Sequence, residues 1–166
     1  LAFGQPGGQG QWPLYVLFGS CDVFFVSAAI SHEWSVEGPL EVRPPREDNY
    51  SGEGCSLAVV GGVLAVATMG GSIYHSVVLG GSSTALHTYE QVELELGQLP
   101  SESSSSVFSC PVRLRSEPGA SGYLASHRAG LHRVELPMVG LLKEELLPDL
   151  SLAGSLVEHL VCTRAS

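Results

Sequence analysis

The chain has 166 residues, of which 44% are hydrophobic, and a mean hydropathy of +0.20, so it can build a core rather than remain disordered. Its 17 acidic side chains against eight basic ones give a formal net charge of −9, which argues against direct binding of nucleic acid or an anionic membrane surface. The 20 glycines and ten prolines separate short β-branched runs, and this distribution favours an all-β chain.

Two apolar runs separated by Gly19-Ser20 predict a first hairpin. They cover residues 12–18 and 21–30. The stretch that follows, 31–54, is rich in glutamate, proline and glycine. We expect it to be a long connection between two sheets.

Three apolar runs over residues 55–79 predict a three-stranded meander, because the Gly-Gly pairs between them suit two-residue hairpin turns. The middle run, 63–68, has no polar side chain before Thr68. Both of its faces should therefore be covered by protein.

A fourth, outermost strand is predicted at 87–96, where apolar and acidic residues alternate. Together with the meander it completes a four-stranded antiparallel sheet over 55–96. Acidic side chains protect an edge strand against unwanted pairing, and they are also candidates for contact with a partner. These candidates are Glu90, Glu93 and Glu95.

Residues 97–111 include a serine run and predict a flexible link. A second copy of the four-stranded unit is predicted over 112–163. Its expected strands are 112–115, 123–127, 131–136 and 156–163.

A helix is predicted inside this second copy, over residues 137–147. Pro137 suits a first helical turn, and an apolar face follows it at helical spacing. We expect this face to pack onto the sheets, the alternative being a partner helix. Leu141 and Leu147 lie off the face and are candidates for outside contacts.

The pattern of four-stranded units predicts an all-β fold, a partial β-propeller of two to three blades with one helical insertion. Residues 1–166 would form part of a single propeller domain, in which 1–30 is a partial blade. Because propellers close with about four or more blades, we expect an apolar sheet face at each end and more protein beyond the sequence. A β-sandwich remains the alternative fold.

The sequence gives little support for catalysis, cofactors or metals. It has no G-x-S-x-G nucleophile elbow, no phosphate-binding loop and no opposed pair of carboxylates. His127 and His132 flank the Ala129-Gly130 turn and could approach each other, but no third ligand accompanies them at a fixed spacing. A non-enzymatic role is therefore expected, with a propeller hydrolase or a generic β interaction domain as rivals.

Four cysteines are widely spaced, without the close pairs of a zinc site. We expect them to be buried free thiols. They are Cys21, Cys55, Cys110 and Cys162.

Several short strings together resemble one family, in the same order along the chain. They include Pro13 to Leu17, Glu47 to Tyr50, Tyr74-His75 with Val77 to Leu79, Val92 to Leu96, Phe108 to Val112, Ala129-Gly130 with His132 and Val134, and Val157 to Thr163. This series resembles the family of the 88-kilodalton nucleoporin.

The resemblance implies a segment of that family's amino-terminal β-propeller. It implies a non-enzymatic scaffold at the cytoplasmic face of the nuclear pore complex, which supports messenger RNA export and nuclear protein export. The implied partners are the large cytoplasmic phenylalanine-glycine nucleoporin and the autoproteolytic domain of the 98-kilodalton nucleoporin. Shortened loops, such as Gly80 to Ser83, put loop-mediated contacts in doubt.

Overall fold

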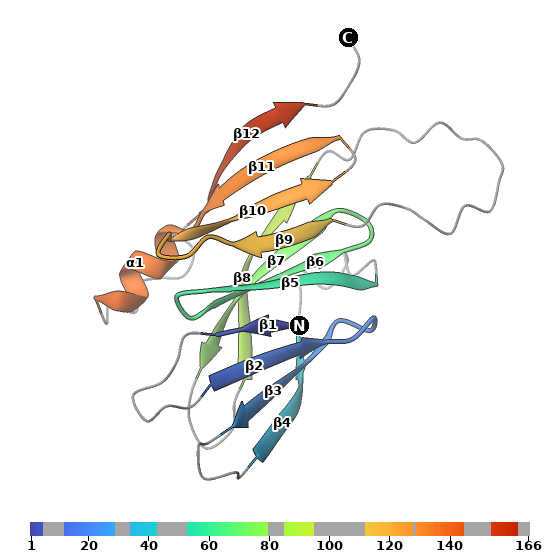
Figure 1. The fold of residues 1–166 in the computed structure, drawn as a ribbon, viewed down its shortest axis with the longest axis vertical. Coiled ribbons are helices and arrows are strands. Elements are labelled where there is room, and N and C mark those ends of the chain that lie inside the picture. The colour runs from blue at the N-terminus through green and yellow to red at the C-terminus, as the bar shows by residue number, and fades with distance from the viewer. Residues whose placement is uncertain are drawn as a thin grey trace, which may run out of the picture.

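A computed structural model of the chain describes residues 1–4, 12–28, 34–42, 53–79, 85–94, 112–127, 129–144 and 154–162. These residues form three four-stranded antiparallel sheets and one short helix (Figure 1). In each sheet the strands lie side by side in chain order. The predicted all-β class, with two to three blade-like sheets and one helical insertion, is confirmed. No helix within the described residues is long and apolar enough to cross a membrane.

The first sheet contains β1 (Ala2–Phe3), β2 (Trp12–Leu17), β3 (Asp22–Ala28) and β4 (Trp34–Glu41). The predicted hairpin is β2 and β3, and its turn is closed by a hydrogen bond of 2.9 Å from the Phe18 amide to the Asp22 carbonyl.

The prediction of a connection over 31–54 is wrong at β4, which completes the first sheet. The strand β4 contains Gly38 and Pro39, which are typical of loops, so its sequence predicts a loop rather than a strand. The strand tolerates them because it lies at the edge of the sheet, where the missing amide of proline has no partner to satisfy. The first unit is therefore a four-stranded sheet rather than a partial one.

The second sheet contains β5 (Gly54–Val60), β6 (Val63–Thr68), β7 (Ser72–Leu79) and β8 (Ala85–Glu93). Gly61 and Gly62 both have positive φ in the β5–β6 turn, as a two-residue hairpin requires. All six residues of β6 are buried, so the predicted cover on both faces is confirmed.

The two faces of β6 pack into two different cores. Val63, Ala65 and Ala67 belong to the core between the second and third sheets. Leu64 and Val66 belong to the core between the first and second sheets. Each fully buried valine or leucine contributes about 1.5–3 kcal/mol, so this strand joins the three sheets energetically.

The third sheet contains β9 (Arg113–Ser116), β10 (Gly122–His127), β11 (Gly130–Glu135) and β12 (Leu156–Cys162). All four strands fall within a residue or two of the predicted ranges. The link predicted at 97–111 lies outside the described residues. Of the predicted thiols, Cys21 is buried and Cys55 half-buried, whereas Cys162 is exposed on β12 and corrects the prediction of burial; Cys110 lies outside the described residues.

The first strands of the three sheets come together. β5 lies beside β9 and also contacts β1. The Leu114 amide donates to the Ser56 hydroxyl over 2.9 Å, and the Cys55 thiol donates to the Val112 carbonyl over 3.3 Å. Figure 1 shows the sheets following one another from the blue strands through green to orange. Successive sheets that meet at their first strands are typical of propeller blades, and they do not match the two facing sheets of a sandwich.

The outward faces of the two terminal sheets differ. A row of paired residues across the first sheet is apolar on every strand: Phe3, Leu14, Val26 and Val36. The matching row across the third sheet is mostly charged: Arg115, Leu124, Arg133 and Glu158. The expected apolar face is therefore present on the first sheet, whereas on the third sheet this row is mostly charged and the exposed apolar side chains lie on β12.

The helix α1 (Pro137–Lys143) connects β11 to β12 and packs onto the β5–β6 turn. Met138 and Val139 are buried in the core between the second and third sheets. A Cβ added to Gly61 would overlap Val139. The predicted intramolecular packing is confirmed, but the helix ends at Lys143 rather than Leu147, because Glu144 leaves the helical region with ψ 4°.

Candidate functional site

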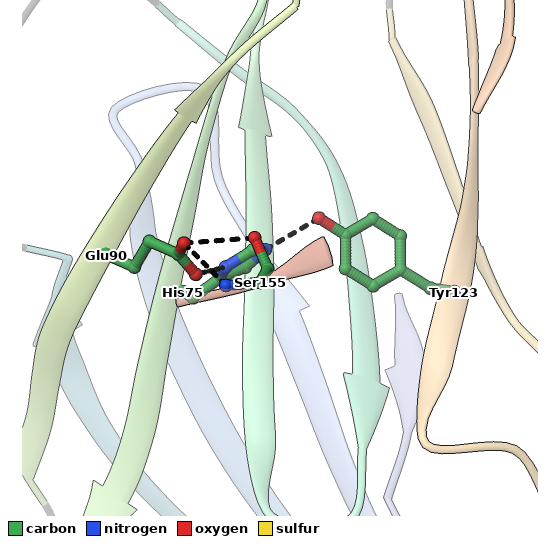
Figure 2. Close-up of polar contacts among 4 residues, drawn as sticks. All are labelled: His75, Glu90, Tyr123 and Ser155. Atoms are coloured by element: carbon green, nitrogen blue, oxygen red, sulfur yellow. Dashed lines mark hydrogen bonds and ion pairs between the residues drawn. The ribbon is translucent and has the colours of Figure 1, made fainter. Parts of the chain in front are cut away.

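A buried polar network joins the second sheet to the third (Figure 2). His75 on β7 has no solvent exposure, and its Nδ1 lies 2.7 Å from a carboxylate oxygen of Glu90 on β8. Its Nε2 lies 2.6 Å from the hydroxyl of Tyr123 on β10. Figure 2 shows the imidazole between the two partners.

The direction of these hydrogen bonds follows from the Tyr123 hydroxyl. Burial raises its pKa, and the nearby Glu90 and Tyr89 raise it further, so the hydroxyl keeps its proton. The Glu90 carboxylate only accepts, so the Nδ1–H of His75 donates to it, and in this tautomer Nε2 accepts from the Tyr123 hydroxyl.

Ser155, just before β12, completes the network. Its amide and its hydroxyl donate to the second oxygen of Glu90 over 2.8 and 3.0 Å. Burial raises the pKa of Glu90, but the hydrogen bonds from His75 and Ser155 outweigh burial and leave this pKa below its usual value. Glu90 therefore works as an ionised bridge between sheets.

Three histidines form a second cluster on the third sheet. The rings of His127 and His132 are stacked with centroids 4.8 Å apart, and the His159 ring lies 4.3 Å from that of His132. The three residues come from β10, β11 and β12, and they form a ladder of rings that ends at the outermost strand. The predicted approach of His127 and His132 is confirmed.

A cleft of about 300 Å³ adjoins this ladder, between the end of the second sheet and the outer part of the third. Its walls are Glu93, Leu94, Ala129, His132, Val157, His159 and Cys162. Within the described residues no group of three or more histidine, cysteine or acidic side chains is arranged to hold a metal ion.

The candidate contact residues are placed differently from one another. Leu141 is half-buried against the core between the second and third sheets. Glu90 is engaged in the network with His75, whereas Glu93 is exposed at the end of β8 and lines the cleft. Leu147 and Glu95 lie outside the described residues.

Neither the buried polar network nor the complete ladder of three histidines was predicted from the sequence. His75 looked like one polar residue in an apolar strand, and only the packing of β7 against β10 brings it to Tyr123. His159 is 27 positions beyond His132 in the sequence, yet the register of β11 and β12 places the two residues directly opposite each other. No local pattern signals such a pair.

Buried polar groups in the network hold one sheet to the next. The family model described as Nup88, nuclear pore component, matches residues 6–166. The chain belongs to the Nup88 family.

Membership of the Nup88 family makes the protein a nuclear pore component, with other nucleoporins as its partners. The matched range includes most of the first sheet and all of the second and third sheets. The polar network and the histidine ladder are therefore parts of a Nup88-family fold.

Proposed function

We propose that the chain is part of a β-propeller that acts as a non-enzymatic scaffold and protein-binding module at the cytoplasmic face of the nuclear pore complex. In this role it supports messenger RNA export and nuclear protein export. The match to the nuclear pore component family over residues 6–166 carries the proposal. Three consecutive four-stranded sheets that meet at their first strands support the propeller.

The apolar outward face of the first sheet supports a further blade beside it. Phe3 and Val36 at the ends of its apolar row are 68% and 65% exposed. A contiguous row of exposed apolar side chains is typical of a surface that another protein element covers. A neighbouring blade of the same protein would cover them. The charged row on the third sheet would meet a polar neighbour instead.

The proposed partners are the large cytoplasmic phenylalanine-glycine nucleoporin and the autoproteolytic domain of the 98-kilodalton nucleoporin. The experiment is purification of the tagged protein from cells under mild extraction, followed by mass spectrometry. Enrichment of both partners over an untagged control supports the proposal. Enrichment of other nucleoporins without these two would refute the named partners but keep the scaffold role.

Contacts with partners are proposed at the acidic margin and at the helix. Glu93 is exposed at the margin, and Leu141 keeps part of its side chain accessible on α1. The residues proposed for these contacts are Leu141, Leu147, Glu90, Glu93 and Glu95. A variant with Leu141→Glu and Leu147→Glu that keeps its fold should lose a partner in the same purification, and unchanged recovery of partners would exclude the helix.

A further inference from the structure

Basic side chains gather on one sheet of an otherwise acidic chain. Of the four arginine and lysine side chains that the structure describes, three lie on the third sheet: Arg113 and Arg115 on β9, and Arg133 on β11. The fourth, Lys143, ends α1. The chain as a whole has a formal net charge of −9, so β9, with two basic side chains and no acidic one, stands apart from the chain around it.

The two arginines of β9 point away from the other sheets. Leu114, which separates them in the strand, packs against the core between the second and third sheets. Side chains alternate along a strand, so Arg113 and Arg115 lie on the outward face of the third sheet, and both are exposed. Leu124 on β10 is directly opposite Arg115 and is half-buried. The outward face therefore presents two charges beside a partly accessible apolar side chain.

The guanidinium groups of Arg113 and Arg115 have no counterion within the described residues. Arg133, two strands away, lies 3.6 Å from Glu117 and 3.6 Å from Glu158, so its charge is offset. A guanidinium is always charged and offers a planar fork of N–H donors that matches a carboxylate. Alternate residues of a strand are about 7 Å apart, so the two free forks have the spacing of alternate side chains in another extended segment.

The charge of these arginines determines which occupant fits the face. The surfaces between the sheets of this fold are apolar cores. Another apolar surface laid on Arg113 and Arg115 would take two charges out of water without partners, which is costly. A segment that brings its own carboxylates avoids this cost, because charged hydrogen bonds replace the lost water. A nucleic acid also brings negative charge, but the net charge of −9 repels a long polyanion.

We propose that the outward face of β9 is a docking site for an extended acidic segment of a partner protein, whose carboxylates at alternate positions pair with Arg113 and Arg115. The segment lies along β9, and the methylene groups of its acidic side chains cover Leu124. The site rests on the proposed role of the chain as a protein-binding module. It adds a basic contact surface to the acidic margin and the helix. Its test uses the purified chain, so a failure removes this site, whereas the scaffold role is tested separately by purification from cells.

The probe is a short fluorescent peptide of threonines with two glutamates at alternate positions. One matched peptide has the same composition with its glutamates adjacent, and another has glutamines in their place. Binding to the 166-residue chain is followed by fluorescence anisotropy. The peptide with alternate glutamates should bind saturably. The peptide with adjacent glutamates should bind about fivefold more weakly, because only one of its acids faces β9 at a time, and the glutamine peptide should not bind.

Two protein variants locate the site. The double variant Arg113→Gln, Arg115→Gln lowers the net charge by two and should weaken binding of the alternate-glutamate peptide about tenfold. Lys143→Glu lowers the net charge by the same amount at an exposed position on α1 and should leave binding unchanged, since salt at about 0.15 M screens distant charges. Circular dichroism checks that both variants fold. If the double variant does not fold, the two glutamate peptides still test the spacing in the unaltered chain.

Three results would overturn the proposal. They are the absence of saturable binding of the alternate-glutamate peptide, equal affinities for the two glutamate peptides, and equal losses of affinity in the double arginine variant and in Lys143→Glu. Self-association of the chain that the double arginine variant abolishes, measured by sedimentation, would assign the face to acidic residues of a second copy and would also overturn it.

Discussion

The Nε2 atom of His75 lies 2.6 Å from the hydroxyl of Tyr123, so one buried hydrogen bond joins the second sheet to the third. Both side chains are fully buried. Replacing Tyr123 with phenylalanine leaves the imidazole nitrogen without a partner, and we expect the free energy of unfolding to fall by about 1–3 kcal/mol. Urea denaturation measures this change.

Tyr89 provides a matched control for that substitution. Its hydroxyl is buried beside the same network but makes no hydrogen bond. Tyr89→Phe removes an unsatisfied polar group and should leave stability unchanged or raise it slightly. Equal losses in the two variants would show that the His75–Tyr123 hydrogen bond does not stabilise the packing of the sheets.

The ionised Glu90 bridge predicts a loss of stability in acid. Burial raises the pKa of Glu90, but the hydrogen bonds from His75 and Ser155 lower it by more than burial raises it. The pKa of Glu90 is therefore below its usual value. The contribution to stability is therefore complete above the unfolded pKa of about 4.3 and is lost as the pH falls through the lower folded value. Glu90→Gln should flatten this part of the profile, measured by thermal unfolding between neutral and acid pH.

Glu93→Gln controls for the loss of one negative charge on the same strand, because Glu93 is exposed. At pH 7 we expect Glu90→Gln to be destabilised and Glu93→Gln to stay within about 0.5 kcal/mol of the original chain. If the Glu90→Gln variant lost as much stability between neutral and acid pH as the original chain, the role of ionised Glu90 as a bridge between the sheets would be contradicted.

The histidine ladder predicts a second pH effect. Burial lowers the pKa of His132, and the neighbouring His159 and His127 lower it further. The unfolded chain then takes up this proton at a higher pH than the folded chain, so stability is complete above about pH 6.5 and decreases as the pH falls toward the folded value. His132→Gln should reduce the slope of stability between pH 7 and 5 in chemical denaturation, and a slope as steep as in the original chain would refute this assignment.

The contact between the β5–β6 turn and α1 predicts strong coupling between Gly61 and Val139. Gly61→Ala is strained at φ +53° and its Cβ overlaps Val139, so it should destabilise the fold. Val139→Ala removes the overlap, and the double variant should be more stable than the sum of the single effects by about 0.5–3 kcal/mol. Strict additivity in urea denaturation would mean that the helix does not pack on this turn.

Gly140→Ala tests the same helix without a steric conflict. No atom lies within 4 Å of an added Cβ at this position. Alanine should stabilise α1 by about 0.5–1 kcal/mol. A loss of stability would contradict the exposed placement of Gly140.

The second sheet was predictable from the sequence because each strand carries its own signal. Residues 63–68 were expected as a strand covered on both faces, and β6 has these bounds and six buried residues. The two glycine turns determine the register of its neighbours. Local chemistry is sufficient where the apolar pattern and the turn residues agree.

β4 and the two polar clusters could not be predicted in this way. Gly38 and Pro39 favour a loop locally, and the edge position that tolerates them exists only once β3 is in place. The contacts of His75 and His159 depend on packing between sheets and on strand register. Such sites arise from tertiary structure, which no spacing in the sequence encodes.

Location in the cell tests the central claim most directly. The protein that contains this chain, tagged with a fluorescent protein at its own gene, should mark a punctate rim at the nuclear envelope that coincides with nuclear pores. A uniform cytoplasmic or nucleoplasmic distribution, with the tagged protein intact and expressed at its normal level, would contradict a scaffold role in the nuclear pore complex.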